Sequence, residues 1–153
     1  MSAEKKPAKA ILFSADPTIV NISDAIAHLQ VNRELYWATG LRISRKNIQF
    51  PILGFINISG QGGCFLAEIN NVIAFRTEHF NDASVKPRSF RDRWEQNPKE
   101  RLHPWKCVLV MTSLNPFFFD TYELKKLDGS VVKKPLRGYA RVVPPINTPM
   151  PVR

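Results

Sequence analysis

Two long apolar stretches joined by a glycine-rich turn constrain the fold more than any other feature of this chain. Residues 49–58 are mostly apolar, and residues 64–77 form a second long stretch with strand character, with a break expected near Asn70-Asn71. Between them stands Gly60-Gln61-Gly62-Gly63, which is typical of a hairpin turn. A run as continuous as 49–58 predicts a strand that is buried on both faces. We therefore expect these two strands to pair at the centre of a sheet.

Shorter patterns predict the elements around this pair. Apolar residues recur three, four and seven positions after Ile22, which is the spacing of an amphipathic helix over residues 20–29. Apolar strands are expected at 9–14, 105–113 and 137–143, and a short extended piece at 34–38. The remaining segments are interpreted as a basic loop or a turn of helix at 41–46, a short helix at 89–96, an aromatic corner at 114–120 and a basic hairpin at 125–135.

Together these elements predict one α+β domain. We expect a curved sheet or pseudo-β-barrel of roughly five to seven strands with about two or three peripheral helices. Residues 1–8 are polar and are expected to be a disordered N-terminus, so the domain spans 9–143. Residues 144–153 are rich in proline and are expected to be a semi-rigid linker to a downstream domain of a longer protein.

The charge balance indicates the kind of partner. The chain has 153 residues, a formal net charge of +9 and a pI of about 9.9. A phosphate backbone, bound with release of counterions, is the simplest partner for such a chain. No apolar run is long enough to span a bilayer, no signal peptide is evident, and Cys64 and Cys107 are expected to be free, buried thiols. These features predict an intracellular protein without a membrane partner.

The sequence does not favour catalysis, a metal site or a cofactor. The three histidines, His28, His79 and His103, are scattered without the spacing of a zinc site. The glycine-rich turn lacks the lysine and hydroxyl residue of a phosphate-binding P-loop. We therefore expect a non-catalytic protein.

The tryptophans are the candidates for base recognition, because an indole stacks on a base at about 1–3 kcal/mol. Trp37 is followed by small residues, which predicts room for a ligand beside its ring. Trp94 lies in a polar, basic segment and is expected to be functional, whereas Trp105 opens an apolar strand and is as compatible with core packing as with a pocket.

The order of these motifs resembles the YTH domain and is similar to the EVE domain, both of the PUA-like superfamily. The resemblance rests on Phe13-Ser14, a helix, Trp37-Ala38-Thr39, an apolar strand closing in Ser59-Gly60, residues 64–69 and Trp105-Lys106. It covers most of residues 9–119. Similar modules also stand at the N-terminus of McrB-type, modification-dependent restriction systems, where a motor domain follows, and the proline-rich end fits that layout.

The resemblance implies a reader of N6-methyladenine that flips the modified base into an aromatic cage. By position, Trp37 matches the first cage tryptophan, Ser14 the serine beside the pocket and Ala38 a residue whose backbone contacts the base. The set of pocket residues expected from the motifs and the resemblance is Trp37, Trp94, Trp105, Ser14, Ala38 and Thr39. The phosphates of methylated DNA or RNA are expected to contact Arg42, Arg45, Lys46, Arg88, Arg91 and Arg93.

The chain departs from the family at two positions, and a second reading of its function stays open. Phe13 replaces a lysine, and Glu100 stands where the second cage tryptophan is expected. The identity of the base is therefore open among N6-methyladenine, 5-methylcytosine and other modifications. The alternative function is a protein-interaction domain whose basic surface docks an acidic partner, with its tryptophans in the core or the interface.

Overall fold

The structure is a computed structural model that describes residues 7–16, 22–39, 41–58, 62–74, 107–136 and 138–149. Within these ranges it contains seven strands and one helix. In chain order they are β1 (Ala8–Ala15), α1 (Ile22–Asn32), β2 (Leu35–Thr39), β3 (Ile48–Ile58), β4 (Gly62–Ala74), β5 (Cys107–Phe119), β6 (Lys125–Lys126) and β7 (Tyr139–Val143). The helix expected at 89–96 lies outside the described residues.

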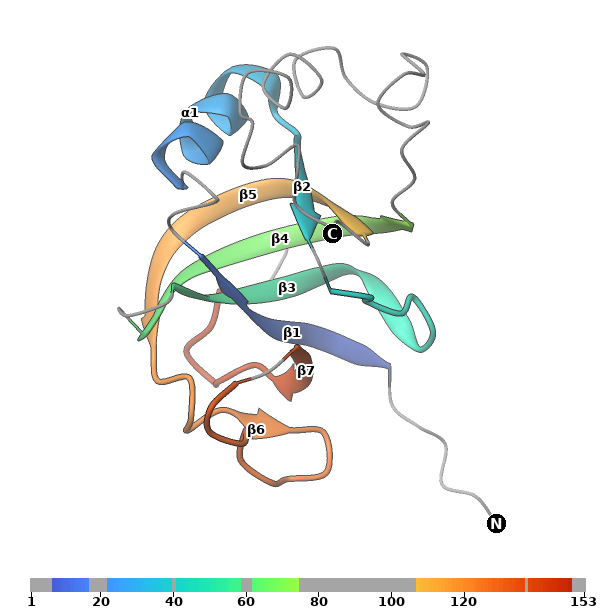
Figure 1. Ribbon diagram of the computed structural model, residues 1–153, viewed down its shortest axis with the longest axis vertical. Coiled ribbons are helices and arrows are strands. Elements are labelled where there is room, and N and C mark those ends of the chain that lie inside the picture. The colour runs from blue at the N-terminus through green and yellow to red at the C-terminus, as the bar shows by residue number, and fades with distance from the viewer. Residues whose placement is uncertain are drawn as a thin grey trace.

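The strands form one mixed sheet in the order β2-β5-β4-β3-β1-β7-β6. β1 runs parallel to β3, and the other pairs are antiparallel. Figure 1 shows that β3, β4 and β5 curve together, with α1 above β5 and β6 on the opposite side, below β1. The prediction of an α+β domain with a curved sheet is confirmed at this level. The described part holds one helix where two or three were expected.

Two apolar clusters explain why the central strands are so continuously apolar. Along β3, Ile52 and Ile56 belong to one cluster, whereas Leu53 and Phe55 belong to the other. Alternate residues of a strand point to opposite faces, so β3 has a buried side chain on each side of the sheet. The prediction that 49–58 is buried on both faces is therefore confirmed. The first cluster also includes contacts from α1 and β2, and the second is completed by residues around β6 and β7.

The long hairpin of β3 and β4 carries the irregularities that bend the sheet. The pairing of β4 with β5 shifts between Ile69 and Asn71, where the break near Asn70-Asn71 was expected. Such shifts are bulges that twist and curve a strand. At the start of β4, Gly63 lies against the ring of Phe119, and a Cβ built there would stand 2.2 Å from a ring carbon. Glycine is therefore required at Gly63 for this close approach.

The prediction of an aromatic corner at 114–120 is wrong, because β5 continues as a strand to Phe119. β2 pairs with β5 only from Cys107 to Met111, so among the described residues the second half of β5 has a strand neighbour on one side only. Pro116 lies in this half, opposite Phe65 of β4. A proline lacks the N–H that a second neighbour would need, and an edge position tolerates that loss.

The helix and the C-terminal residues also refine the predictions. α1 is amphipathic as expected, with Ala25 buried and Ile22, Ile26 and Leu29 packed against the first cluster, but it extends to Asn32. No helix in the described ranges is long and apolar enough to cross a bilayer. Residues 144–149 of the expected linker fold back on the domain, with the N–H of Thr148 donating to the carbonyl of Pro145 at 3.0 Å and Thr148 buried.

Candidate nucleic-acid interface

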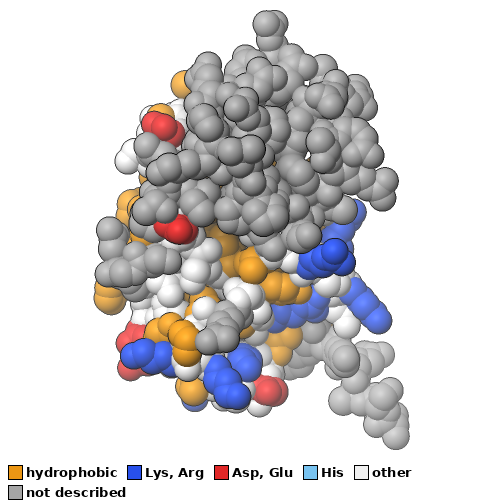
Figure 2. All heavy atoms as spheres, in the orientation of Figure 1, with side chains coloured by type: hydrophobic (Ala, Val, Ile, Leu, Met, Phe, Trp, Pro, Cys, Tyr) orange, Lys and Arg blue, Asp and Glu red, His pale blue; other side chains and the backbone are white. Residues whose placement is uncertain are grey.

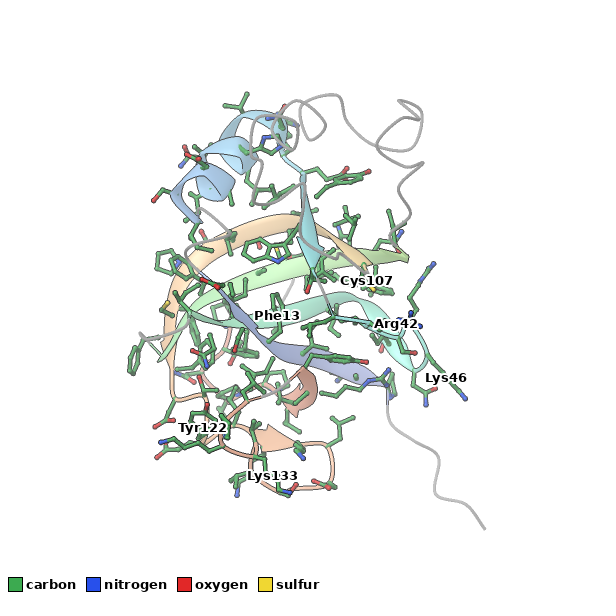
Figure 3. The ribbon with its side chains drawn as sticks, viewed as in Figure 1. Phe13, Arg42, Lys46, Cys107, Tyr122 and Lys133 are labelled. Carbon is green, nitrogen blue, oxygen red and sulfur yellow. The ribbon has the colours of Figure 1, made fainter. Side chains whose placement is uncertain are left out.

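A basic loop, residues 41–47, joins β2 to β3 and carries three of the cations expected to bind phosphate. Arg42, Arg45 and Lys46 are all exposed. Figure 3 shows Arg42 and Lys46 on the same side of the molecule, at the end of the curved sheet where β3 begins. The sequence holds no aspartate or glutamate between Glu34 and Glu68, so no neighbouring carboxylate along the chain neutralises the loop. The structure therefore brings these three predicted residues together.

The first half of the basic loop is fixed to the core. The N–H of Leu41 donates to Oγ1 of Thr39 at 3.2 Å, and the N–H of Ile43 donates to Sγ of Cys107 at 3.3 Å. The side chain of Ile43 belongs to the first apolar cluster. Buried anchors on both sides of Arg42 hold its backbone in one place while its side chain stays in solvent.

The second half of the basic loop is held by β7. The N–H of Ser44 donates to the hydroxyl of Tyr139 at 3.2 Å. Nη2 of Arg141 donates to the carbonyl of Ser44 at 3.4 Å and to the carbonyl of Lys46 at 2.5 Å. Bonds from a charged donor are stronger than neutral ones. Arg141 therefore ties two carbonyls of the loop to β7 and adds a further positive charge beneath it.

Contacts at the end of the basic loop complete the arrangement. Asn47 has a left-handed backbone with φ of 57°, and its carbonyl accepts the N–H of Ala8 at 2.7 Å. The guanidinium of Arg45 lies 5.9 Å from the ring centre of Phe50, a cation–π contact. A loop that is fixed before binding loses less conformational entropy when it takes a ligand. The geometry thus suits a preformed site for anions.

The residues expected to form the base pocket are distributed differently. Trp37 is 4% exposed and belongs to the first apolar cluster, with its ring edge-on to Phe13 at a centroid distance of 6.2 Å. Thr39 is buried and its hydroxyl is used by the basic loop. A base could stack on the indole of Trp37 only after neighbouring side chains move. In the structure as it stands, this ring is a core residue.

Ser14 lies apart from Trp37. It is exposed near the end of β1 and pairs with Asn57, whereas its neighbour Phe13 packs on Trp37. Because neighbouring strand residues point to opposite faces, Ser14 faces away from the cluster that contains the indole. The backbone of Ala38 pairs with Val108 in the sheet. Trp94, Trp105, Arg88, Arg91 and Arg93 lie outside the described residues.

Three residues that sequence reasoning did not assign to the site are its supports: Tyr139, Arg141 and Cys107. The bonds that join them to the loop span 64 to 97 residues of sequence. No local pattern predicts such contacts, although the strand expected at 137–143 includes both Tyr139 and Arg141. Within the described ranges, no three His, Cys, Asp or Glu side chains lie close enough to hold a metal ion.

Comparison with known proteins gives no relative from which a function could be transferred. No family model matches the chain, and neither a curated protein nor a solved structure does so. The site must therefore be interpreted from its own chemistry.

Proposed function

We propose that this chain is a non-catalytic nucleic-acid-binding domain that contacts the phosphate backbone through the basic loop. The observation that carries the proposal is the exposed trio Arg42, Arg45 and Lys46 on a backbone fixed by Tyr139 and Arg141. Arginine and lysine side chains on a fixed frame suit phosphate, which accepts several charge-assisted hydrogen bonds. The net charge of +9 adds a long-range attraction that steers a polyanion to the surface.

The finer part of the proposal is that the domain reads a modified base, N6-methyladenine first among the candidates. It rests on the resemblance of the motif order to the PUA-like YTH and EVE domains. The order of β1, α1, the Trp37-bearing β2 and the paired β3 and β4 is compatible with that resemblance. In this proposal a flipped base enters beside β2, and the packing over Trp37 opens when the base arrives. Methylated DNA or RNA is then the partner, and a motor domain would follow in a longer chain.

A titration with matched oligonucleotides tests both parts. Fluorescence anisotropy is measured with single-stranded and duplex DNA and RNA, each with and without one N6-methyl group, from low to moderate salt. We expect binding that weakens as salt rises and a lower Kd for the methylated strands. Absence of binding at low salt would end the nucleic-acid proposal. Salt-dependent binding with equal Kd for both strands would end the reader proposal alone.

The burial of Trp37 favours the second candidate, a protein-interaction domain that docks an acidic partner. In that case the indole is simply core, and the basic surface recognises carboxylates. A polyglutamate of matched charge separates the two candidates. The acidic-partner function requires polyglutamate to compete as well as the oligonucleotide does, whereas phosphate recognition requires the oligonucleotide to compete better.

A further inference from the structure

A second basic site lies beside β6 and β7. Figure 2 shows Lys and Arg side chains at the right and along the lower edge of the visible face, with Asp and Glu side chains also at the lower edge. A groove of about 440 Å³ is lined there by Lys126, Lys133 and Lys134, with Val132, Leu136 and Tyr139 among its apolar walls. This volume falls within the range of roughly 300–1,000 Å³ that is usual for ligand sites. Its lining contains three lysines and no carboxylate.

The groove is preformed by the hairpin that leads into it. The N–H of Lys126 donates to the carbonyl of Ser130 at 2.7 Å, and the turn is closed by the N–H of Gly129, which donates to the carbonyl of Lys126 at 3.0 Å. Gly129 has φ of 88°, which only glycine adopts easily. The turn's one carboxylate, Asp128, accepts bonds from both the N–H and the hydroxyl of Ser130. Asp128 is therefore engaged with the turn, and its charge also interacts with Lys126 of the groove lining.

The far wall of the groove is fixed as well. The ammonium of Lys134 lies 5.5 Å from the ring centre of Tyr122, and the hydroxyl of Tyr122 accepts the N–H of Leu136 at 3.1 Å. Figure 3 shows Tyr122 and Lys133 at the β6 end of the molecule, apart from Arg42 and Lys46. Cations above an apolar floor suit a nucleotide, whose phosphate needs the charge and whose sugar and base need apolar surface.

Tyr139 joins this groove to the basic loop. It lines the groove, and its hydroxyl accepts the N–H of Ser44 in the loop. Arg141, two residues further along β7, holds the same loop. One strand of the sheet, β7, therefore contacts both the groove and the basic loop.

We propose that the β6–β7 groove is a second contact site for the same nucleic acid, in which Lys126 and Lys133 hold phosphate groups of the strand that the basic loop binds. This inference rests on the proposed function, and it extends the interface from one loop to a track across β7. The ligand class at the groove is a nucleotide segment of DNA or RNA.

The test compares two neighbouring lysines that lie on opposite faces of β6. Lys126 lines the groove, whereas Lys125 is exposed and is not part of its lining. The Kd for a long oligonucleotide is measured against salt for the unaltered chain, Lys125→Gln, Lys126→Gln and the double variant Lys126→Gln/Lys133→Gln. Each lost phosphate contact lowers the slope of log K against log salt by about 0.7–0.9. We expect the magnitude of this slope to fall by roughly 1.5 in the double variant and to stay unchanged in Lys125→Gln.

The outcomes separate this inference from the function on which it rests. If the unaltered chain binds in a salt-dependent way and the slope is unchanged in the double variant, the groove is not a contact site, and the proposal for the basic loop stands. Equal losses in Lys125→Gln and Lys126→Gln also overturn it, since they indicate general electrostatics. Absence of salt-dependent binding by the unaltered chain overturns both. Circular dichroism spectra of all variants should superimpose, because these lysines are at the surface.

Discussion

β2 and the basic loop follow one another in the chain, yet they differ in how far their candidate binding side chains are exposed to solvent. β2 places Trp37 in the core, against Phe13. The basic loop begins two residues after β2 ends, and it places Arg42, Arg45 and Lys46 in solvent on a fixed backbone. The comparison teaches that the charges are ready for a ligand, whereas the aromatic ring is not. In the proposed interface, phosphate reaches these exposed side chains without rearrangement, whereas a base reaches Trp37 only after neighbouring side chains move.

The largest effect is expected on the β2 side of this comparison. Trp37→Ala removes a buried aromatic side chain and should lower the free energy of unfolding by about 3–5 kcal/mol. Urea denaturation measures this loss, with Trp37→Phe as the control that retains an aromatic core residue. A loss below about 1 kcal/mol would show that the indole is not a core residue.

The same pair of variants sharpens the question of base reading. If the packing over Trp37 opens for a modified base, Trp37→Phe should fold, keep its salt-dependent binding and lose part of its preference for the methylated strand. The anisotropy titration described above measures that preference. An undiminished preference in the folded Trp37→Phe variant would place the reading of the base elsewhere.

A smaller effect is expected from the support of the basic loop. Arg141→Ala removes the donor to the carbonyls of Ser44 and Lys46, so the loop should lose order and affinity for an oligonucleotide should fall by roughly 5- to 10-fold, about 1 kcal/mol. Both bonds come from Nη2 of the planar guanidinium, and Arg141→Lys keeps the charge but lacks that fixed planar geometry. If the loss comes from positioning, Arg141→Lys should resemble Arg141→Ala. Full affinity in Arg141→Lys would assign the effect to charge alone.

Tyr139→Phe tests the other support with a single atom. The change removes the hydroxyl that accepts the Ser44 N–H. Water partly takes the place of this acceptor, so we expect the free energy of oligonucleotide binding to weaken by about 0.5 kcal/mol. Hydrogen exchange at the Ser44 amide should become faster, whereas the amide of Ile43, bonded to Cys107, should be unchanged. An equal acceleration at both amides would indicate that the whole loop depends on Tyr139.

The smallest expected effect concerns the outer face of β2. Burial raises the pKa of Tyr36 above its ordinary value of 10.0, and the nearby charge of Glu34 and a hydrogen bond to it add to the shift. The folded protein thus holds the phenol proton more tightly than the unfolded chain does. Its contribution to stability is complete below about pH 10 and is lost as pH rises through the raised value. Tyr36→Phe should flatten the decline of stability in alkaline solution, which denaturation at roughly pH 9 and 11 measures. Parallel declines in both proteins would contradict the shift.

Much of the fold could be predicted from the sequence, because it follows from local patterns. The two-faced burial of β3 follows from a continuous apolar run, the break in β4 from Asn70-Asn71, and the helix that contains Ile22 and Leu29 from the spacing of apolar residues. The length of β5 could not be predicted, because a proline within an aromatic run suggests a corner unless its neighbours are known. Pro116 is tolerated since β2 stops short of it.

The residues of the candidate site likewise fall into those that the local sequence predicts and those that depend on contacts distant in the chain. Arg42, Arg45 and Lys46 stand in one short polar stretch, so their shared exposure could be predicted from the chain itself. The burial of Trp37 could not, because small residues after an indole leave room that Phe13, 24 residues earlier, fills instead. The roles of Tyr139 and Arg141 depend on β7 lying beside β1, a pairing that brings distant residues to the loop.

The most direct measurement of the central claim is the salt dependence of oligonucleotide binding by the triple variant Arg42→Ala/Arg45→Ala/Lys46→Ala. These side chains are exposed, so the free energy of unfolding of the variant should differ from that of the unaltered chain by no more than about 0.5 kcal/mol. If the basic loop holds the phosphate backbone, the slope of log K against log salt should fall by roughly 2–3. A variant that binds with the unaltered slope would contradict the account.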